Sequence, residues 1–170
     1  MTRFSLPRTV SAALLAVSAL ALSSCGFTPL YGPQSVTNGL SAIEVVAADG
    51  RAGYLLREQL DDAFGRNVNL LPSHRLVYTI EEQRYARGIR VDNVANRYEL
   101  KLTAKWRLLD AKTGQEVRAG TTSAAVTYDS ADQPYASIAA QQDSEERAAT
   151  ELARRIQLDL ATWLAGKAKA

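Results

Sequence analysis

The chain has 170 residues and a formal net charge of +2, from 20 basic and 18 acidic residues. This length predicts a single domain, and 46% apolar with 22% charged residues is ordinary for a globular protein. The composition excludes wholesale disorder, a collagen-like repeat and a polytopic membrane protein, and the small basic excess argues against a nucleic-acid binder. The single cysteine, Cys25, excludes an intramolecular disulfide, a CxxC redox pair and a multi-cysteine metal site.

The first residues have the pattern of a secretory signal peptide. Two arginines make the start positive, the apolar run 10–22 carries no charge, and two serines precede Cys25. An apolar core of about 13 residues is shorter than the roughly 20 that a transmembrane helix needs. Removal of residues 1–24 takes both arginines away, so the mature chain of 146 residues has 18 basic and 18 acidic residues.

The end of this segment, Leu-Ser-Ser-Cys at 22–25, resembles a bacterial lipobox. The resemblance implies cleavage before Cys25, a diacylglycerol on its thiol and a fatty acid such as palmitate on the new amino group. Two or more acyl chains anchor a protein stably to a membrane. Gly26, in place of aspartate, indicates the outer membrane under the usual sorting rule. The alternative is a free thiol beside an ordinary cleavage site.

Residues 25–40 predict an extended, lipidated tether, because glycines, prolines and an Asn-Gly pair interrupt the segment too often for regular structure. The domain is then expected over 41–170. Its first elements are a short strand over 41–47, an amphipathic helix over 53–64 ended by Gly65, and a strand over 75–83.

Residues 98–109 alternate between apolar and polar side chains, which predicts a strand with one buried and one wet face. The turn sequence 110–114 follows, and 116–128 is expected to return as the second strand of a hairpin. This second strand is rich in Ala, Thr and Ser, which suits a sheet edge or a closely covered surface.

From Tyr135 onward the apolar period becomes helical, and the helix is expected to begin near Pro134 or to be interrupted at 141–144. The order of elements predicts an α+β fold in which two helices pack on one face of a mostly antiparallel sheet of about four strands.

Few residues indicate catalysis. His74 is the single histidine, and no nucleophile elbow, HExxH pattern or glycine-rich phosphate loop is present. Three pairs of adjacent carboxylates are expected on solvated faces, because neighbouring residues point to different sides. The sequence therefore predicts no enzyme activity, no catalytic residue, no metal site and no cofactor, with His74 at the end of a turn.

One charged segment stands out between residues 84 and 107, where seven basic residues face only two acidic ones. Three of the seven are expected on the wet face of one strand, and the others in the connection that precedes it. Guanidinium and ammonium groups attract phosphate and carboxylate, so the segment predicts a contact for a phosphorylated glycolipid or an acidic protein surface; an ordinary charged sheet face is the alternative. The seven are Arg84, Arg87, Arg90, Arg97, Lys101, Lys105 and Arg107.

The sequence also resembles a known family. Cys-Gly-Phe-Thr-Pro-Leu-Tyr-Gly at 25–32 is similar to the start of mature lipopolysaccharide-assembly lipoproteins, the LptE family, and especially to its alphaproteobacterial branch. The alanine-rich pattern from Tyr135 to Ile156 is similar as well. The resemblance covers nearly the whole mature chain and implies two helices against a four-stranded sheet.

The resemblance implies a function and partners. Members sit on the periplasmic side of the outer membrane, plug the lumen of the β-barrel lipopolysaccharide (LPS) translocon LptD, and assist its assembly and the delivery of LPS to the outer leaflet, with direct LPS contact. No nucleic acid is expected. The alternatives are an auxiliary lipoprotein of a lipid-transport ABC system and an envelope hydrolase, for which the single His74 is a poor basis.

Overall fold

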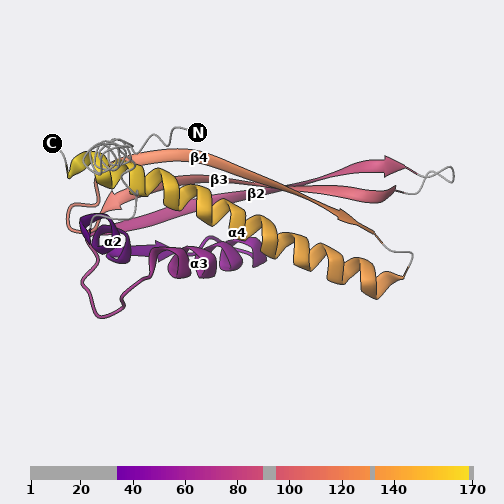
Figure 1. Ribbon diagram of the computed structural model, residues 1–170, viewed down its shortest axis with the longest axis horizontal. Helices are drawn as coiled ribbons and strands as arrows, with labels where there is room; N and C mark the ends of the chain where they lie inside the picture. Colours follow the sequence, from indigo (N-terminus) through magenta and orange to yellow (C-terminus); the bar gives the residue numbers. More distant parts are fainter. Residues whose placement is uncertain (1–33, 90–94, 131–132, 169–170) are drawn as a thin grey trace, which may run out of the picture.

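The computed structural model describes residues 34–89, 95–130 and 133–168. Within these ranges, three helices cover one face of a four-stranded sheet (Figure 1). The α+β prediction is confirmed, with one helix more than expected. The elements in chain order are α2 (Gln34–Ser41), β1 (Ile43–Val46), α3 (Arg51–Phe64), β2 (His74–Ile89), β3 (Ala95–Asp110), β4 (Glu116–Asp129) and α4 (Pro134–Lys167).

The sheet has the strand order β1-β2-β3-β4, with β1 parallel to β2 and every other pair antiparallel. The predicted β3–β4 hairpin is confirmed, and β4 is an edge strand. The turn between them closes on Asp110, whose Oδ1 accepts hydrogen bonds from the amides of Lys112 and Thr113 at 2.9 and 2.8 Å. Gly114 adopts the positive φ of 70° that this turn requires.

The alternation in β3 separates a buried face from an outer face. Five β3 side chains are at most 1% exposed and belong to the core that α4 covers: Leu100, Leu102, Ala104, Trp106 and Leu108. Their neighbours Lys101, Lys105 and Arg107 point to the opposite face. Because successive side chains of a strand point to opposite faces, these three cations lie on the outer face of β3, as the sequence predicted.

Helix α2 corrects the prediction that residues up to 40 lack regular structure. Val36 and Leu40 are buried in the core, and α2 packs on α4. Gly39 is a packing position and not a turn, because a Cβ added there would lie 3.0 Å from Leu164 Cδ1. The expected signal peptide, Cys25 and the first part of the tether lie outside the described residues.

The other two helices agree with the sequence pattern. Helix α3 ends at Gly65, which has a φ of 58° and donates its backbone N–H to Asp62. Helix α4 begins at Pro134 and runs unbroken to Lys167, so the expected interruption at 141–144 is absent from it. Proline at the first helical position loses no hydrogen bond, which favours this start.

Strands β2 and β3 are longer than predicted. The basic stretch expected as a connection belongs mostly to the strands: Arg84 and Arg87 lie in β2, and Arg97 lies in β3. Arg90 lies outside the described residues. The two strands form a ribbon that extends toward the end of the molecule opposite α2 (Figure 1).

Candidate functional site

The outer face of the sheet carries the predicted cations in its centre. Lys101 and Lys105 form no ion pair within the described residues, and Arg107 has only a long contact of 4.0 Å from its Nε to Glu116. In the strand register, Lys105 stands between Thr79 and Thr121. Short hydroxyl side chains therefore surround an uncompensated positive charge.

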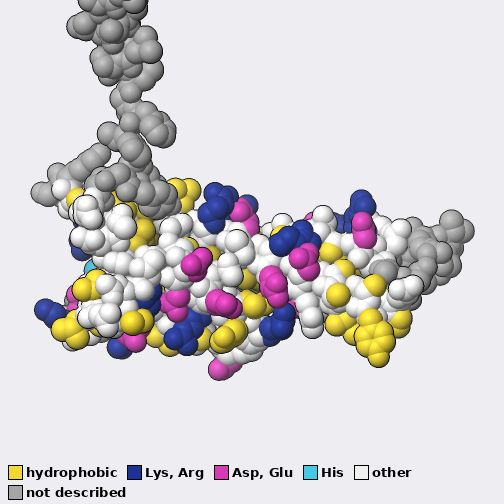
Figure 2. All heavy atoms as spheres, turned by 60° about the horizontal axis from the view of Figure 1, so that its bottom comes forward, with side chains coloured by type: hydrophobic (Ala, Val, Ile, Leu, Met, Phe, Trp, Pro, Cys, Tyr) yellow, Lys and Arg dark blue, Asp and Glu magenta, His cyan; other side chains and the backbone are white. Residues whose placement is uncertain are grey.

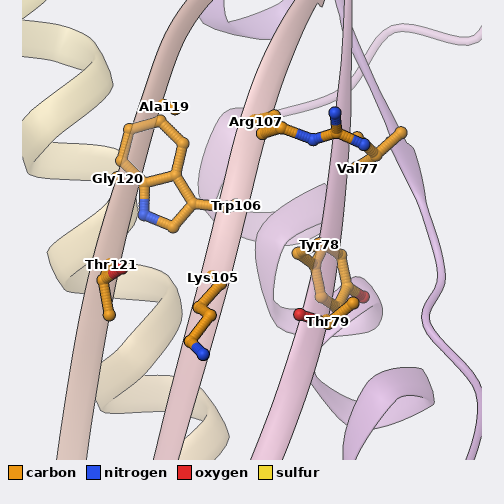
Figure 3. A pocket seen from close by; sticks show the side chains of 9 residues that line it. All are labelled: Val77, Tyr78, Thr79, Lys105, Trp106, Arg107, Ala119, Gly120 and Thr121. Carbon is orange, nitrogen blue, oxygen red and sulfur yellow. The ribbon is translucent and has the colours of Figure 1, made fainter.

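A shallow depression of about 510 Å³ opens on this face across β2, β3 and β4. Figure 3 shows Arg107 extending from β3 across β2 toward Val77, while Lys105 points along the face away from it. Most of the residues that line the depression have small side chains, and the long side chains of Lys105 and Arg107 stand at its rim. The lining residues are Val77, Tyr78, Thr79, Lys105, Trp106, Arg107, Ala119, Gly120 and Thr121.

Two of the lining residues, Trp106 of β3 and Gly120 of β4, form a tight contact on the helix side of the sheet. A Cβ added to Gly120 would lie 2.4 Å from Trp106 Cζ2, so the indole fills the space that a side chain would need. Trp106 donates its indole N–H to Thr122 Oγ1 at 3.0 Å and is 1% exposed. The ring thus stays buried on the helix side of the sheet, held by its hydrogen bond to β4.

Two further arginines of the predicted cluster are neutralised. Arg87 donates two hydrogen bonds to the carboxylate of Glu99 at 3.1 and 3.0 Å, and Arg97 contacts Asp129 at 2.7 and 3.4 Å. These bonds lower the pKa of both carboxyl groups. Bidentate pairing of this kind orients an arginine toward its own partner.

Arg84 points away from the other cations, so the expectation of one cluster is wrong for this residue. In the register of β2 it follows Leu76 and Tyr78 on the helix side, where its guanidinium donates to Gln141 Oε1 at 2.9 Å. Lys101, Lys105 and Arg107 remain together as the candidate anion-binding face.

His74 has a structural setting. Its ring packs edge-on against Trp163 with the ring centroids 5.6 Å apart, and Nδ1 lies 2.9 Å from Ser73 Oγ. Burial, and secondarily the charge of Lys167, lowers the pKa of His74, while Asp110 opposes the shift. Asp110 Oδ1 accepts the hydrogen bonds of the β3–β4 turn, and among the described residues the hydrogen-bond partner of the His74 ring is Ser73 and not Asp110.

Sequence reasoning missed a polar network beneath the sheet. Glu145 was expected on a solvated face, yet it is 6% exposed and accepts hydrogen bonds from Arg51 Nε at 2.9 Å and Gln141 Nε2 at 3.0 Å. Desolvation, followed by the nearby Glu145 charge, raises the pKa of Glu82. The adjacent Glu146 stays exposed, so two neighbouring glutamates of the sequence lie in different environments, one buried and one in solvent.

Solved structures similar to this chain include bacterial lipoproteins. A lipoprotein from Caulobacter crescentus CB15 shares 65% identity, with a TM-score of 0.69 over 78% of this chain and 96% of that one. Rare lipoprotein B from Shewanella oneidensis has the same fold at 15% identity, with a TM-score of 0.55 over 73% of this chain and 96% of that one. Among proteins with curated descriptions, none matches significantly.

The family follows from the sequence of the domain itself. The family model for LptE, described as lipopolysaccharide-assembly, matches residues 40–160, which is most of the chain. The protein belongs to the LptE family of lipopolysaccharide-assembly lipoproteins. In the described ranges, no helix is both long and apolar enough to cross a membrane.

Proposed function

We propose that this protein is a non-enzymatic, lipid-anchored subunit of the outer-membrane LPS translocon. Cys25 carries the acyl chains and holds the protein on the periplasmic side of the outer membrane. The domain occupies the lumen of the β-barrel LptD, assists its assembly and helps deliver LPS to the outer leaflet. Membership of the LptE family supports this proposal.

The surface chemistry of the sheet supports the lumen position. Around the two lysines, β2 and β4 display Thr79, Thr121 and Ser123 on the outer face, and no described helix covers this side. The interiors of outer-membrane barrels are polar. A hydroxyl-rich sheet face can therefore lie beside such a wall, whose polar groups can hydrogen-bond its threonines and pair with its lysines.

The observation that carries the LPS-contact part is Lys105, a lysine without an ion pair among the described residues, which lines the depression, with Lys101 on the same face of β3 outside it. Lys101 and Lys105 are four residues apart on one strand, so both point to the same face. An ammonium group binds phosphate as a point charge, and Arg107 adds a guanidinium on the rim of the depression. The three together suit the phosphate groups of a phosphorylated glycolipid.

The direct test is LPS binding by the Lys101→Glu, Lys105→Glu double variant. Reversal of both charges replaces attraction by repulsion, and we expect affinity for purified LPS to fall by about tenfold at low salt, since exposed charge contacts contribute up to about 1 kcal/mol each. The difference from the unaltered protein should shrink as the salt concentration rises, because salt screens exposed charges.

A matched control changes the same charge elsewhere. Arg57 and Lys112 are exposed and outside the depression, so the Arg57→Glu, Lys112→Glu variant should keep most of the affinity at the same net charge. If both double variants lost LPS affinity equally, the loss would be an effect of net charge and not of the outer face of the sheet. Unchanged LPS binding in Lys101→Glu, Lys105→Glu would refute contact through this face.

A further inference from the structure

The connection between α3 and β2 displays apolar side chains to solvent. Val68 is 79% exposed, Leu70 is 45% exposed and Leu71 is 92% exposed. These three residues form the apolar loop. Exposed apolar side chains gathered in one loop cost free energy in water, and a patch of such side chains is typical of a contact with a partner or a membrane.

The backbone holds this loop in place. The Asn67 N–H donates to Ser41 O at 3.2 Å, and the Ser73 N–H donates to Ala42 O at 2.9 Å, so both ends of the loop are tied to the end of α2. Inside the loop, Asn67 Oδ1 accepts from the Asn69 amide at 3.0 Å. The apolar side chains are therefore presented from a fixed backbone.

The attachment to α2 limits how far the apolar loop can lie from the predicted anchor. Helix α2 begins at Gln34, nine positions after Cys25. Nine residues span at most about 30 Å when fully extended, and the eight residues of α2 add about 12 Å. A bilayer that holds acyl chains on Cys25 thus lies within reach of the loop.

An aromatic and a basic side chain accompany the loop at this end. Trp163 packs against His74, the first residue of β2, and Lys167 Nζ lies 4.7 Å from the centroid of the Trp163 ring. Figure 1 shows α2, the α3–β2 connection and the end of α4 at one end of the molecule, and Figure 2 shows hydrophobic and basic side chains there. Trp and Lys are favoured at the boundary between water and lipid.

We propose that the apolar loop enters the phospholipid leaflet that carries the acyl anchor, with Trp163 and Lys167 at the level of the headgroups. The inference rests on the proposed lipidation of Cys25. An apolar contact beside the acyl chains gives the domain a second membrane attachment and fixes which end faces the bilayer. Lipid is favoured over a protein partner because the tether limits the distance to the bilayer and because the loop adjoins an aromatic–basic pair.

The test measures how deeply the loop lies in a membrane. Acylation occupies Cys25, the single cysteine, so Leu71→Cys introduces a unique free thiol for an environment-sensitive fluorophore. The labelled, lipidated full-length product is reconstituted into phosphatidylethanolamine–phosphatidylglycerol vesicles that contain a spin-labelled quencher lipid. Tyr135→Cys is the matched control, because Tyr135 is 89% exposed and begins α4 at the opposite end.

We expect several-fold stronger quenching at position 71 than at position 135, and a reduction at position 71 when Val68→Ser and Leu70→Ser are added. Vesicle flotation is measured first, and circular dichroism checks the fold of each variant. A protein that does not float refutes the anchor, and this inference with it. A protein that floats but shows no quenching at 71, or equal quenching at both positions, overturns the membrane contact alone and leaves the anchor standing.

Discussion

At the scale of single residues, the contact between Trp106 and Gly120 connects the core to the candidate site. The indole occupies the space where a side chain on β4 would lie, and its N–H is satisfied by Thr122. A side chain at position 120 would point to the same side of the sheet as Trp106, because the two residues are cross-strand partners, and it would crowd the core. The packing of the core at this point thus depends on one glycine.

We predict that Gly120→Ala destabilises the protein by about 1–3 kcal/mol, the usual cost of overpacking a well-filled core. The added methyl group would lie 2.4 Å from the Trp106 ring, so the ring or the strand must shift. Urea unfolding followed by circular dichroism measures the change in free energy of unfolding.

Gly166→Ala is the control for this substitution. No atom lies within 4 Å of a Cβ at that helical position, and alanine reduces the entropy of the unfolded chain, so we expect unchanged or slightly increased stability. A Gly120→Ala protein as stable as the unaltered one would contradict the packing described for Trp106.

The charges show which residue properties sequence could predict. Alternation along β3 correctly predicted that Lys101, Lys105 and Arg107 share a face. It could not predict that Glu99 and Asp129 neutralise Arg87 and Arg97, because those ion pairs depend on β-strand register and on residues up to 32 positions away. The count of basic and acidic residues between 84 and 107 therefore overestimated how much positive charge the sheet surface presents.

At the scale of elements, α4 holds the fold together. It contacts α2, α3, β3 and β4, and its buried stripe includes Leu152, Ile156 and Leu160, each 0% exposed. Two positions before Leu160, Leu158 on another side of the helix is 45% exposed. One helix thus offers the same residue type in a buried and an exposed setting.

We predict that Leu160→Ala lowers the free energy of unfolding by about 2–5 kcal/mol, because it removes buried methyl groups and leaves a cavity. Leu158→Ala should change it by no more than about 0.5 kcal/mol, as expected for an exposed position. Thermal or urea unfolding of the two variants gives the comparison, and equal losses would contradict the orientation of α4.

Local sequence patterns predicted most elements. Period two indicated β3 and the hairpin with β4, and helical spacing indicated α3 and α4. Helix α2 escaped prediction because Asn38 and Gly39 are typical of a turn, whereas Gly39 serves close packing against Leu164, a contact 125 positions away. The sequence also failed to predict the end of β2 after residue 83. Residues there show no regular alternation of apolar and polar side chains, and their strand conformation depends on pairing with β3.

At the scale of the whole molecule, the two ends differ. The apolar loop, α2 and the end of α4 lie at one end, and the β2–β3 ribbon leads to the other (Figure 1). A strand of 16 residues such as β3 spans about 50 Å, which exceeds the roughly 30 Å core of a bilayer. An anchored protein with its apolar loop at the membrane would therefore direct the ribbon away from the attachment point.

The central claim is that this lipoprotein is a subunit of the LPS translocon, and the identity of its partner tests it most directly. The lipidated protein would be affinity-purified from detergent-solubilised membranes, and co-purified proteins would be identified by mass spectrometry. We predict recovery of a large outer-membrane β-barrel in near-equal amount. Recovery of an inner-membrane ABC permease without that barrel would contradict the claim and favour the auxiliary lipoprotein of a lipid-transport system.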